Sequence, residues 1–176
     1  MLRTFVIIIN VMSKTLTKNF FNRPAVTVAK ELLGKFLVRE FPRRSAVASR
    51  HGQRQSARHK VAVMITETEA YVGPHDLACH ASRGRTKRNG PMFGEAGHFY
   101  VYFTYGMHWM LNIVTGPKGY PAAVLVRGGV FCDKKQKVIN GPAKLTKFLK
   151  INDKLSARGG PASSWNGKPA NKKTGL

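Results

Sequence analysis

Residues 61–71 of the chain read Val61-Ala-Val-Met-Ile-Thr-Glu-Thr-Glu-Ala-Tyr71. From Val61 to Glu67 the residues are mostly β-branched or apolar, which predicts a buried strand. Glu69 and Tyr71 follow at or just past the end of that strand, where a rigid sheet aims functional side chains. Because residues two apart point to the same face of a strand, Glu69 and Tyr71 share a face. The stretch therefore predicts a candidate site at this strand, with Glu69 as its general base.

Acidic residues are rare in this chain, and several gather beside that strand. Glu67, Glu69 and Asp76 are three of only eight Asp and Glu residues, whereas the formal net charge is +22. A surface that attracts polyanions gains little from local negative charge, so these acids are candidates for chemistry. Taken singly, Glu67 is better explained as an ion-pair partner and His80 as a structural histidine. Together with Tyr71 and His75, they supply the groups of a hydrolytic site.

Composition indicates one folded domain with a polyanionic partner. The chain has 176 residues, 43% hydrophobic content, 30 Lys and Arg, and a pI near 10.7. This balance is typical of nucleic-acid binders, although ribosomal and membrane-surface proteins share it. Two cysteines make neither a disulfide framework nor a zinc motif, which indicates a reducing compartment, the cytoplasm or the nucleoid. No stretch approaches the roughly 20 apolar residues that cross a bilayer.

The rest of the chain alternates short apolar segments with basic loops. The pattern predicts a short helix between Pro24 and Gly34, and a basic helix over 142–149. Strands are predicted over 36–41 and 122–127, and a hairpin is predicted from 99–105 and 108–114. The Arg- and Lys-rich segments 43–60 and 83–91 are predicted to be loops. The first is most simply a solvated insertion, and the second suits phosphate contacts.

Tyrosines on the predicted hairpin are candidates for holding a nucleic-acid base. Tyr100 and Tyr102 share one face by alternation, and core packing is the better explanation for Tyr100 taken alone. Tyr102 and Tyr105 stand out because Tyr71, His80 and the basic charge accompany them. Aromatic faces are how proteins hold unstacked bases.

Several separated motifs, in order, resemble the alkyladenine (3-methyladenine) DNA glycosylase family. They are Glu67–Tyr71, Arg85–Asn89 with Met92-Phe93, Tyr100–Tyr102, Tyr105–Met107, Asn112, Arg127, and Asn140–Pro142 with Lys144-Leu145. The resemblance covers about residues 16–155. It implies an α+β fold, a single mixed domain around a curved, mainly antiparallel β-sheet with short flanking helices. The expected organisation is an N-terminal extension over 1–11 before a second start at Met12, a glycosylase domain over 12–157 with the basic insertion at 43–60, and an irregular tail over 158–176.

The resemblance implies a monofunctional repair enzyme that needs no cofactor and no metal. Such an enzyme flips an alkylated or deaminated purine out of double-stranded DNA and hydrolyses its N-glycosidic bond, leaving an abasic site. It is expected to act as a monomer that does not associate with a membrane. No lysine lies between Glu67 and His80, so a Schiff-base nucleophile is not evident.

Residue roles follow from the same resemblance. Glu69 activates the attacking water, and Arg127 supports that water. The base pocket consists of Tyr71, His80, Tyr102 and Asn112, and Asn112 crowds the amino group of guanine. Tyr105 fills the gap in the duplex by intercalation, while Arg85, Lys87 and Arg88 contact phosphates.

Two other functions compete with this one. A metal-dependent nuclease could use Glu67, Glu69, Asp76, His75 and His80 as ligands, since carboxylates and imidazoles bind Mg²⁺, Mn²⁺ or Zn²⁺. A basic nucleic-acid-binding module, which includes a degenerate glycosylase, would use the same acids structurally. Sensitivity to a chelator separates the nuclease from the glycosylase, and binding without base release indicates the module.

Overall fold

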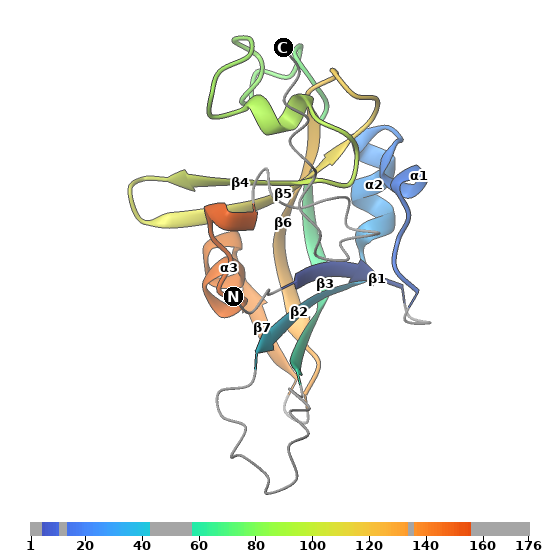
Figure 1. Cartoon of the computed structure of the whole chain (residues 1–176), viewed down its shortest axis with the longest axis vertical. Coiled ribbons are helices and arrows are strands. Elements are labelled where there is room, and N and C mark those ends of the chain that lie inside the picture. The colour runs from blue at the N-terminus through green and yellow to red at the C-terminus, as the bar shows by residue number, and fades with distance from the viewer. Residues whose placement is uncertain (1–4, 11–13, 43–57, 134–135, 156–176) are drawn as a thin grey trace, which may run out of the picture.

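One antiparallel sheet dominates the fold, which a computed structural model describes over residues 5–10, 14–42, 58–133 and 136–155. The described residues form seven strands, in the order β1-β2-β3-β6-β5-β4, with β7 pairing to β6 (Figure 1). Their bounds are β1 Phe5–Ile9, β2 Phe36–Pro42, β3 Arg58–Tyr71, β4 Phe99–Thr104, β5 His108–Thr115, β6 Ala122–Phe131 and β7 Lys137–Asn140. The predicted α+β class is confirmed.

Strands β3 and β6 form the centre of the sheet. The first half of β3 pairs with β2, from Pro42↔Arg58 to Phe36↔Met64. Its second half pairs with β6, up to Tyr71↔Ala123. Strand β6 in turn pairs with β5 through its first residues and with β7 through its last ones. Strand β3 is longer than the predicted Val61–Glu67, so Glu69 lies within the strand and Tyr71 is its last residue.

The helices are short, and they cover the sheet. They are α1 Lys18–Phe21, α2 Ala25–Leu32, α3 Pro142–Phe148, and the 3₁₀ turns η1 Gly90–Phe93 and η2 Asp153–Leu155. Helix α2 begins after Pro24 and buries Val28 and Leu32 completely. The Thr68 hydroxyl donates to the Ala29 carbonyl oxygen at 3.0 Å, which places α2 on the Thr68 face of β3. Among the described residues, no helix is long and apolar enough to span a bilayer.

The predicted boundaries of the N-terminal extension, the basic insertion and the tail can be compared with the structure only in part. Strand β1 lies within the segment predicted as an N-terminal extension, and its residues pair with β2 from Phe5↔Glu40 to Ile9↔Phe36. The basic segment predicted over 43–60 lies outside the described residues up to 57, and residues 58–60 begin β3. The tail predicted over 158–176 also lies outside the described residues.

Arg39 is a buried cation in β2. Only 8% of its surface is exposed, and its Nε and Nη1 atoms have no hydrogen-bond partner among the residues that the structure describes. Its Nη2 atom donates to the Lys150 carbonyl oxygen at 3.4 Å. Burial lowers the pKa of Arg39 to about 10. A buried guanidinium with this few partners is an uncompensated cost to the fold.

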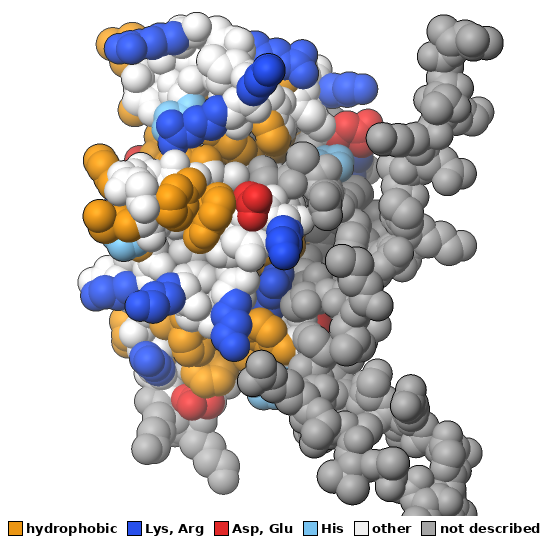
Figure 2. Space-filling view, turned by 60° about the vertical axis from the view of Figure 1, so that its left-hand side comes forward, with side chains coloured by type: hydrophobic (Ala, Val, Ile, Leu, Met, Phe, Trp, Pro, Cys, Tyr) orange, Lys and Arg blue, Asp and Glu red, His pale blue; other side chains and the backbone are white. Residues whose placement is uncertain are grey.

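The surface that carries the β4–β5 hairpin is strongly basic. Figure 2 shows Lys and Arg side chains above and below a band of hydrophobic side chains on this face. At the turn of the hairpin, Tyr105 is 87% exposed and Met107 is 65% exposed. Tyr105 and Gly106 have φ values of 50° and 65°, the left-handed conformation that closes this turn. Apolar side chains so exposed on a basic surface suit contact with a nucleic acid.

Candidate active site

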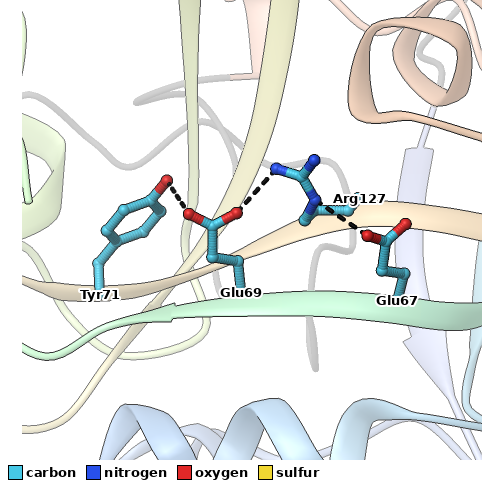
Figure 3. Close-up of polar contacts among 4 residues, drawn as sticks. All are labelled: Glu67, Glu69, Tyr71 and Arg127. Carbon is cyan, nitrogen blue, oxygen red and sulfur yellow. Dashed lines mark hydrogen bonds and ion pairs between the residues drawn. The ribbon is translucent and has the colours of Figure 1, made fainter. Parts of the chain in front are cut away.

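The centre of the candidate site is a carboxylate pair that shares one arginine. Glu67 and Glu69 of β3 both face Arg127 of β6 (Figure 3). Arg127 donates from Nε to Glu67 Oε1 at 3.1 Å and from Nη1 to Glu69 Oε2 at 2.8 Å. The three side chains are between 38% and 49% exposed. Two carboxylates and one guanidinium leave this group one negative charge in a basic protein.

A β-bulge explains why Arg127 can reach both carboxylates. In the ladder between β3 and β6, Glu67 pairs with Gly128 but Thr68 pairs with Val126. Arg127 is the extra residue between these two pairs. Bulges re-aim a side chain and recur beside active sites. This one sets the guanidinium between two carboxylates that are two residues apart.

Glu69 is held from its other side by Tyr71. The Tyr71 hydroxyl donates to Glu69 Oε1 at 2.8 Å, so each oxygen of Glu69 accepts one strong bond. Burial first, and then the bond to Glu69, raise the pKa of Tyr71. The phenol therefore stays a donor. Because a carboxylate accepts about four hydrogen bonds, Glu69 keeps capacity for a water molecule.

The register of the sheet aligns further site residues with Glu69. Glu69 pairs with Leu125, Leu125 pairs with Asn112, and Asn112 pairs with Tyr100. Directly paired residues share a face, so this row crosses β3, β6, β5 and β4 on the side that carries Glu69. Asn112 is buried, and its Nδ2 atom donates to the Tyr100 carbonyl oxygen at 3.3 Å. The row connects the carboxylate to the aromatic residues of β4.

A small pocket lies over this row, beside Glu69. Its lining consists of Tyr71, Ala78, His80, Met92, Tyr100, Tyr102 and Asn112. The ring centroids of His80 and Tyr102 are 4.4 Å apart at 75°, and those of Tyr100 and Tyr102 are 5.4 Å apart. His80 Nδ1 lies 3.2 Å from the Tyr100 hydroxyl. His80 and Tyr102 are thus in edge-to-face contact on one side of the pocket, which we call the aromatic wall.

Burial and charge set the protonation of this wall. Burial raises the pKa of Tyr100 to about 12. Partial desolvation, and then the charge of Arg88, lower the pKa of His80. At neutral pH the wall is therefore uncharged.

The loop that follows β3 is anchored at the pocket. The Asp76 carboxylate accepts the backbone N–H groups of Val72 at 3.2 Å and Ala78 at 3.0 Å. The Tyr120 hydroxyl donates to the Val72 carbonyl oxygen at 2.8 Å. Gly73 has a φ of 126°, which other residues rarely adopt, and a Cβ there would also overlap the Tyr120 hydroxyl unless that side chain moved. These contacts fix the backbone directly after Tyr71.

The structure separates the residues that a metal would need. Glu67 and Glu69 face Arg127, whereas Asp76 binds backbone N–H groups in the next loop. Across the described part of the chain, no three His, Cys, Asp or Glu side chains group as a metal site would require. The ligand set considered for a nuclease is therefore not brought together.

The other predicted residues are not part of the pocket lining. Tyr105 lies at the hairpin turn, separate from the pocket lining. Lys87 is exposed on the basic loop, and the Arg85 guanidinium lies 5.4 Å from the centroid of Phe93. Arg88 lies 5.3 Å from the centroid of Tyr102 and donates from Nη2 to the Phe103 carbonyl oxygen at 2.9 Å.

Four residues at the site had no role there predicted from the sequence. Met92 and Ala78 line the pocket. Met92 lies in one of the motifs that resemble the family, which was its signal, whereas nothing in the residue type of Ala78 indicated its position. Asn89 is buried and donates from Nδ2 to the carbonyl oxygens of His80 and Gly84, both at 2.9 Å. Tyr100 was assigned to the core and is indeed buried, but it also lines the pocket. Its alternation with Tyr102 was the signal that could have found it.

Comparisons with known proteins show which family the chain resembles. Residues 52–162 match the model of the family described as methylpurine-DNA glycosylase (MPG). The chain is 42% identical over 154 residues to a protein of Methanocella arvoryzae, covering 80% of this chain and 70% of that protein. It is 45% identical over 137 residues to a protein of Rickettsia rickettsii, covering 78% and 64%. It is 38% identical over 173 residues to a protein of Streptomyces avermitilis, covering 88% and 74%.

Each of these three relatives bears the name "Putative 3-methyladenine DNA glycosylase". The matched part of the chain spans between 64% and 74% of their lengths.

Proposed function

The chain belongs to the methylpurine-DNA glycosylase family, and on that premise we propose that it excises alkylated purines from double-stranded DNA by hydrolysing their N-glycosidic bonds. The observation that carries the proposal is the position of Glu69. Its carboxylate is held by Tyr71 and Arg127 beside an aromatic pocket that Tyr71 also lines. This hydrolysis needs a general base, a water molecule for that base to activate, and aromatic side chains on which the purine stacks.

Base flipping brings the substrate to the pocket. A base within a duplex is unreachable, so it must be extruded at a cost of a few kcal/mol. Tyr105 at the exposed hairpin turn would enter the stack and offset part of that cost. A flipped purine would lie between Tyr71 and the wall formed by His80 and Tyr102. Stacking on aromatic side chains contributes about 1–3 kcal/mol per base.

Charge favours alkylated purines over normal ones. A methyl group at N3 or N7 makes the purine cationic, and a cation over an aromatic ring gains roughly 0.5–2 kcal/mol. The same charge makes the purine a good leaving group. Asn112, held by its bond to Tyr100, would crowd the amino group of guanine and disfavour that base.

Hydrolysis then proceeds at Glu69. The sugar develops oxocarbenium character as the glycosidic bond breaks, and the negative carboxylate stabilises that charge. Glu69 removes a proton from the attacking water while the water oxygen forms a bond to the anomeric carbon. Arg127 uses its Nε–H and one Nη1–H on the two carboxylates, so the second Nη1–H and the Nη2 amino group are the donors that would hold the water. The products are a free base and an abasic site in an intact strand.

The remaining parts of the proposal concern the surroundings of the reaction. Arg85, Lys87 and Arg88 would contact phosphates next to the flipped nucleotide. The protein would act as a monomer without a cofactor, in the cytoplasm or at the nucleoid. Deaminated purines such as hypoxanthine would be further substrates.

One experiment tests the proposed function. The protein is incubated with a duplex carrying a single alkylated or deaminated purine, with and without EDTA, and free base and strand breaks are assayed separately. We expect base release that EDTA does not affect, with strand breaks appearing only after alkaline treatment. Cleavage that EDTA abolishes would indicate the nuclease. Binding without base release would indicate a nucleic-acid-binding module.

A further inference from the structure

Arg88 contacts the outer side of the aromatic wall. It belongs to the basic loop between His80 and η1, yet it reaches β4 at two points. Its guanidinium lies 5.3 Å from the ring centroid of Tyr102, and its Nη2 atom bonds to the Phe103 carbonyl oxygen at 2.9 Å. Arg88 is absent from the pocket lining, although Tyr102 is part of it. The guanidinium therefore supports the ring from outside the pocket.

The loop that carries Arg88 is tied to His80 by its neighbour. Asn89 Nδ2 donates to the His80 carbonyl oxygen, and Asn89 Oδ1 accepts the Thr86 N–H at 2.6 Å. The Asn89 N–H in turn donates to the Thr86 hydroxyl at 3.2 Å. A buried side chain with this many bonds fixes the loop backbone. Arg88 thus holds a defined place relative to both halves of the wall.

We propose that Arg88 is a positioning residue that steadies Tyr102 from outside the pocket and sets its fixed positive charge beside the wall, so that the wall accepts a cationic purine. This inference rests on the proposed function. It assigns Arg88 a role beyond a phosphate contact, and it concerns discrimination between charged and neutral bases.

Arg88 is the charged side chain whose repulsion contributes, after burial, to the lowered pKa of His80. The groups facing its ring are the phenols of Tyr71 on β3 and of Tyr100 and Tyr102 on β4, together with Arg88. On its own loop, Asp76 is occupied by the Val72 and Ala78 N–H groups. The phenols are neutral throughout the physiological pH range, because the pKa values of all three tyrosines are raised by burial. Arg88 opposes protonation of the imidazole by repulsion between like charges.

The charge of His80 would decide which bases the wall accepts. An imidazolium in the wall repels a purine methylated at N3 or N7, whereas a neutral purine such as hypoxanthine carries no net charge to be repelled. Partial burial and Arg88 both lower the pKa of His80, so the neutral form persists into mildly acidic conditions. Without the charge of Arg88, the pKa of His80 rises. Below that pKa the neutral fraction falls about tenfold per pH unit.

The test compares Arg88→Gln with the wild-type protein from pH 5 to pH 8. Single-turnover release is measured for a purine methylated at N7 and for hypoxanthine, and each rate is divided by the wild-type rate at the same pH. A guanidinium stays charged throughout this range, so its direct effect on a bound base does not vary with pH. We expect the ratio for the methylated purine to fall as the pH falls, while the ratio for hypoxanthine stays level.

Two matched variants separate charge from position. Arg88→Lys keeps the charge but loses the guanidinium that lies over the Tyr102 ring, so both ratios should fall equally at every pH. Arg85→Gln removes a guanidinium that lies on Phe93 instead, and it should weaken DNA binding without changing either pH profile. Melting curves check that each variant is folded.

The titration of His80, followed by NMR of its imidazole, needs no substrate. An upward shift in Arg88→Gln, with none in Arg88→Lys, supports the inference even if the wild-type protein releases no base and the proposed function fails. An unchanged His80 titration in Arg88→Gln, together with ratios that do not depend on pH, would overturn the inference and leave Arg88 as a phosphate contact.

Discussion

Replacing Glu69 by glutamine isolates the base while keeping the shape of the site. In Glu69→Gln the new side-chain amide can accept a bond from Arg127 Nη1 through its carbonyl oxygen and can donate through its NH₂ group to the Tyr71 hydroxyl. Both are the positions of present 2.8 Å bonds. The net charge of the group changes from one negative charge to zero. Folding should change little, since these side chains are about 40% exposed and such pairs contribute less than about 1 kcal/mol.

We expect Glu69→Gln to reduce the rate of catalysis. A positioned general base contributes about 10²–10⁴-fold to the rate, which corresponds to about 3–5 kcal/mol of barrier. We therefore expect Glu69→Gln to slow single-turnover base release by that factor, with lesion binding largely kept. Release is measured by alkaline cleavage of the abasic product, and binding is measured by fluorescence anisotropy with the same duplex.

Glu67→Gln is the matched control. Glu67 also bonds to Arg127, but at 3.1 Å through Nε, and its partners in the site do not include Tyr71. Its loss should slow release by less than about fivefold, the equivalent of one exposed ion pair. Equal losses in the two variants would contradict the assignment of Glu69 as the base. A Glu69→Gln variant that keeps a tenth or more of the wild-type rate would contradict it as well.

Three other substitutions test separate parts of the molecule. Tyr105→Ala should reduce the preference for lesion-bearing over undamaged duplex by about 1–3 kcal/mol in competition binding, and an unchanged preference would remove Tyr105 from the interface. Asn112→Ser should lower the melting temperature, because a buried bond to Tyr100 is lost, and should raise release of guanine-type bases relative to adenine-type bases. Earlier melting with unchanged selectivity would leave Asn112 a purely structural role. Arg39→Met should raise the free energy of unfolding by about 1–4 kcal/mol in urea titrations, because it removes a buried cation with two unpaired nitrogens, and a large loss of stability would refute that reasoning.

Local pattern was sufficient for most elements of the fold. The β4–β5 hairpin, β2, α2 and α3 were predicted within one or two residues, because each buries a face with clear periodicity between turn residues. Strand β3 was predicted too short. Its last residues alternate Thr with Glu, and their extended form depends on pairing with β6. Strands β1 and β7 were not predicted, since a short apolar or mixed segment becomes a strand only beside its partner.

The sequence was sufficient to propose which residues belong to the site, but not to predict the contacts and distances between them. Glu69 and Tyr71 could be placed together, because both lie on one strand. The contacts of Arg127 join segments that are 58 and 60 residues apart, and they depend on a bulge that no local pattern reveals. The same holds for Arg88, whose positive charge suggested phosphate but whose guanidinium lies over Tyr102. Distances across a sheet are set by register, which the sequence of one strand does not contain.

The placement of β3 and β6 inside the sheet also has a consequence for motion. Strand β6 lies between β3 on one side and β5 or β7 on the other, and β3 pairs with β6 on both sides of Glu69, so the hydrogen exchange of these backbone amides should be slow because it requires the central ladder to open. The turn at Tyr105 ends a hairpin whose outer strand, β4, lies last in the strand order, and it should exchange through local opening. Reaction geometry would then be kept in the most slowly opening part of the protein. The turn at Tyr105, which would enter the duplex, could change conformation at each DNA site without moving the Glu69 carboxylate.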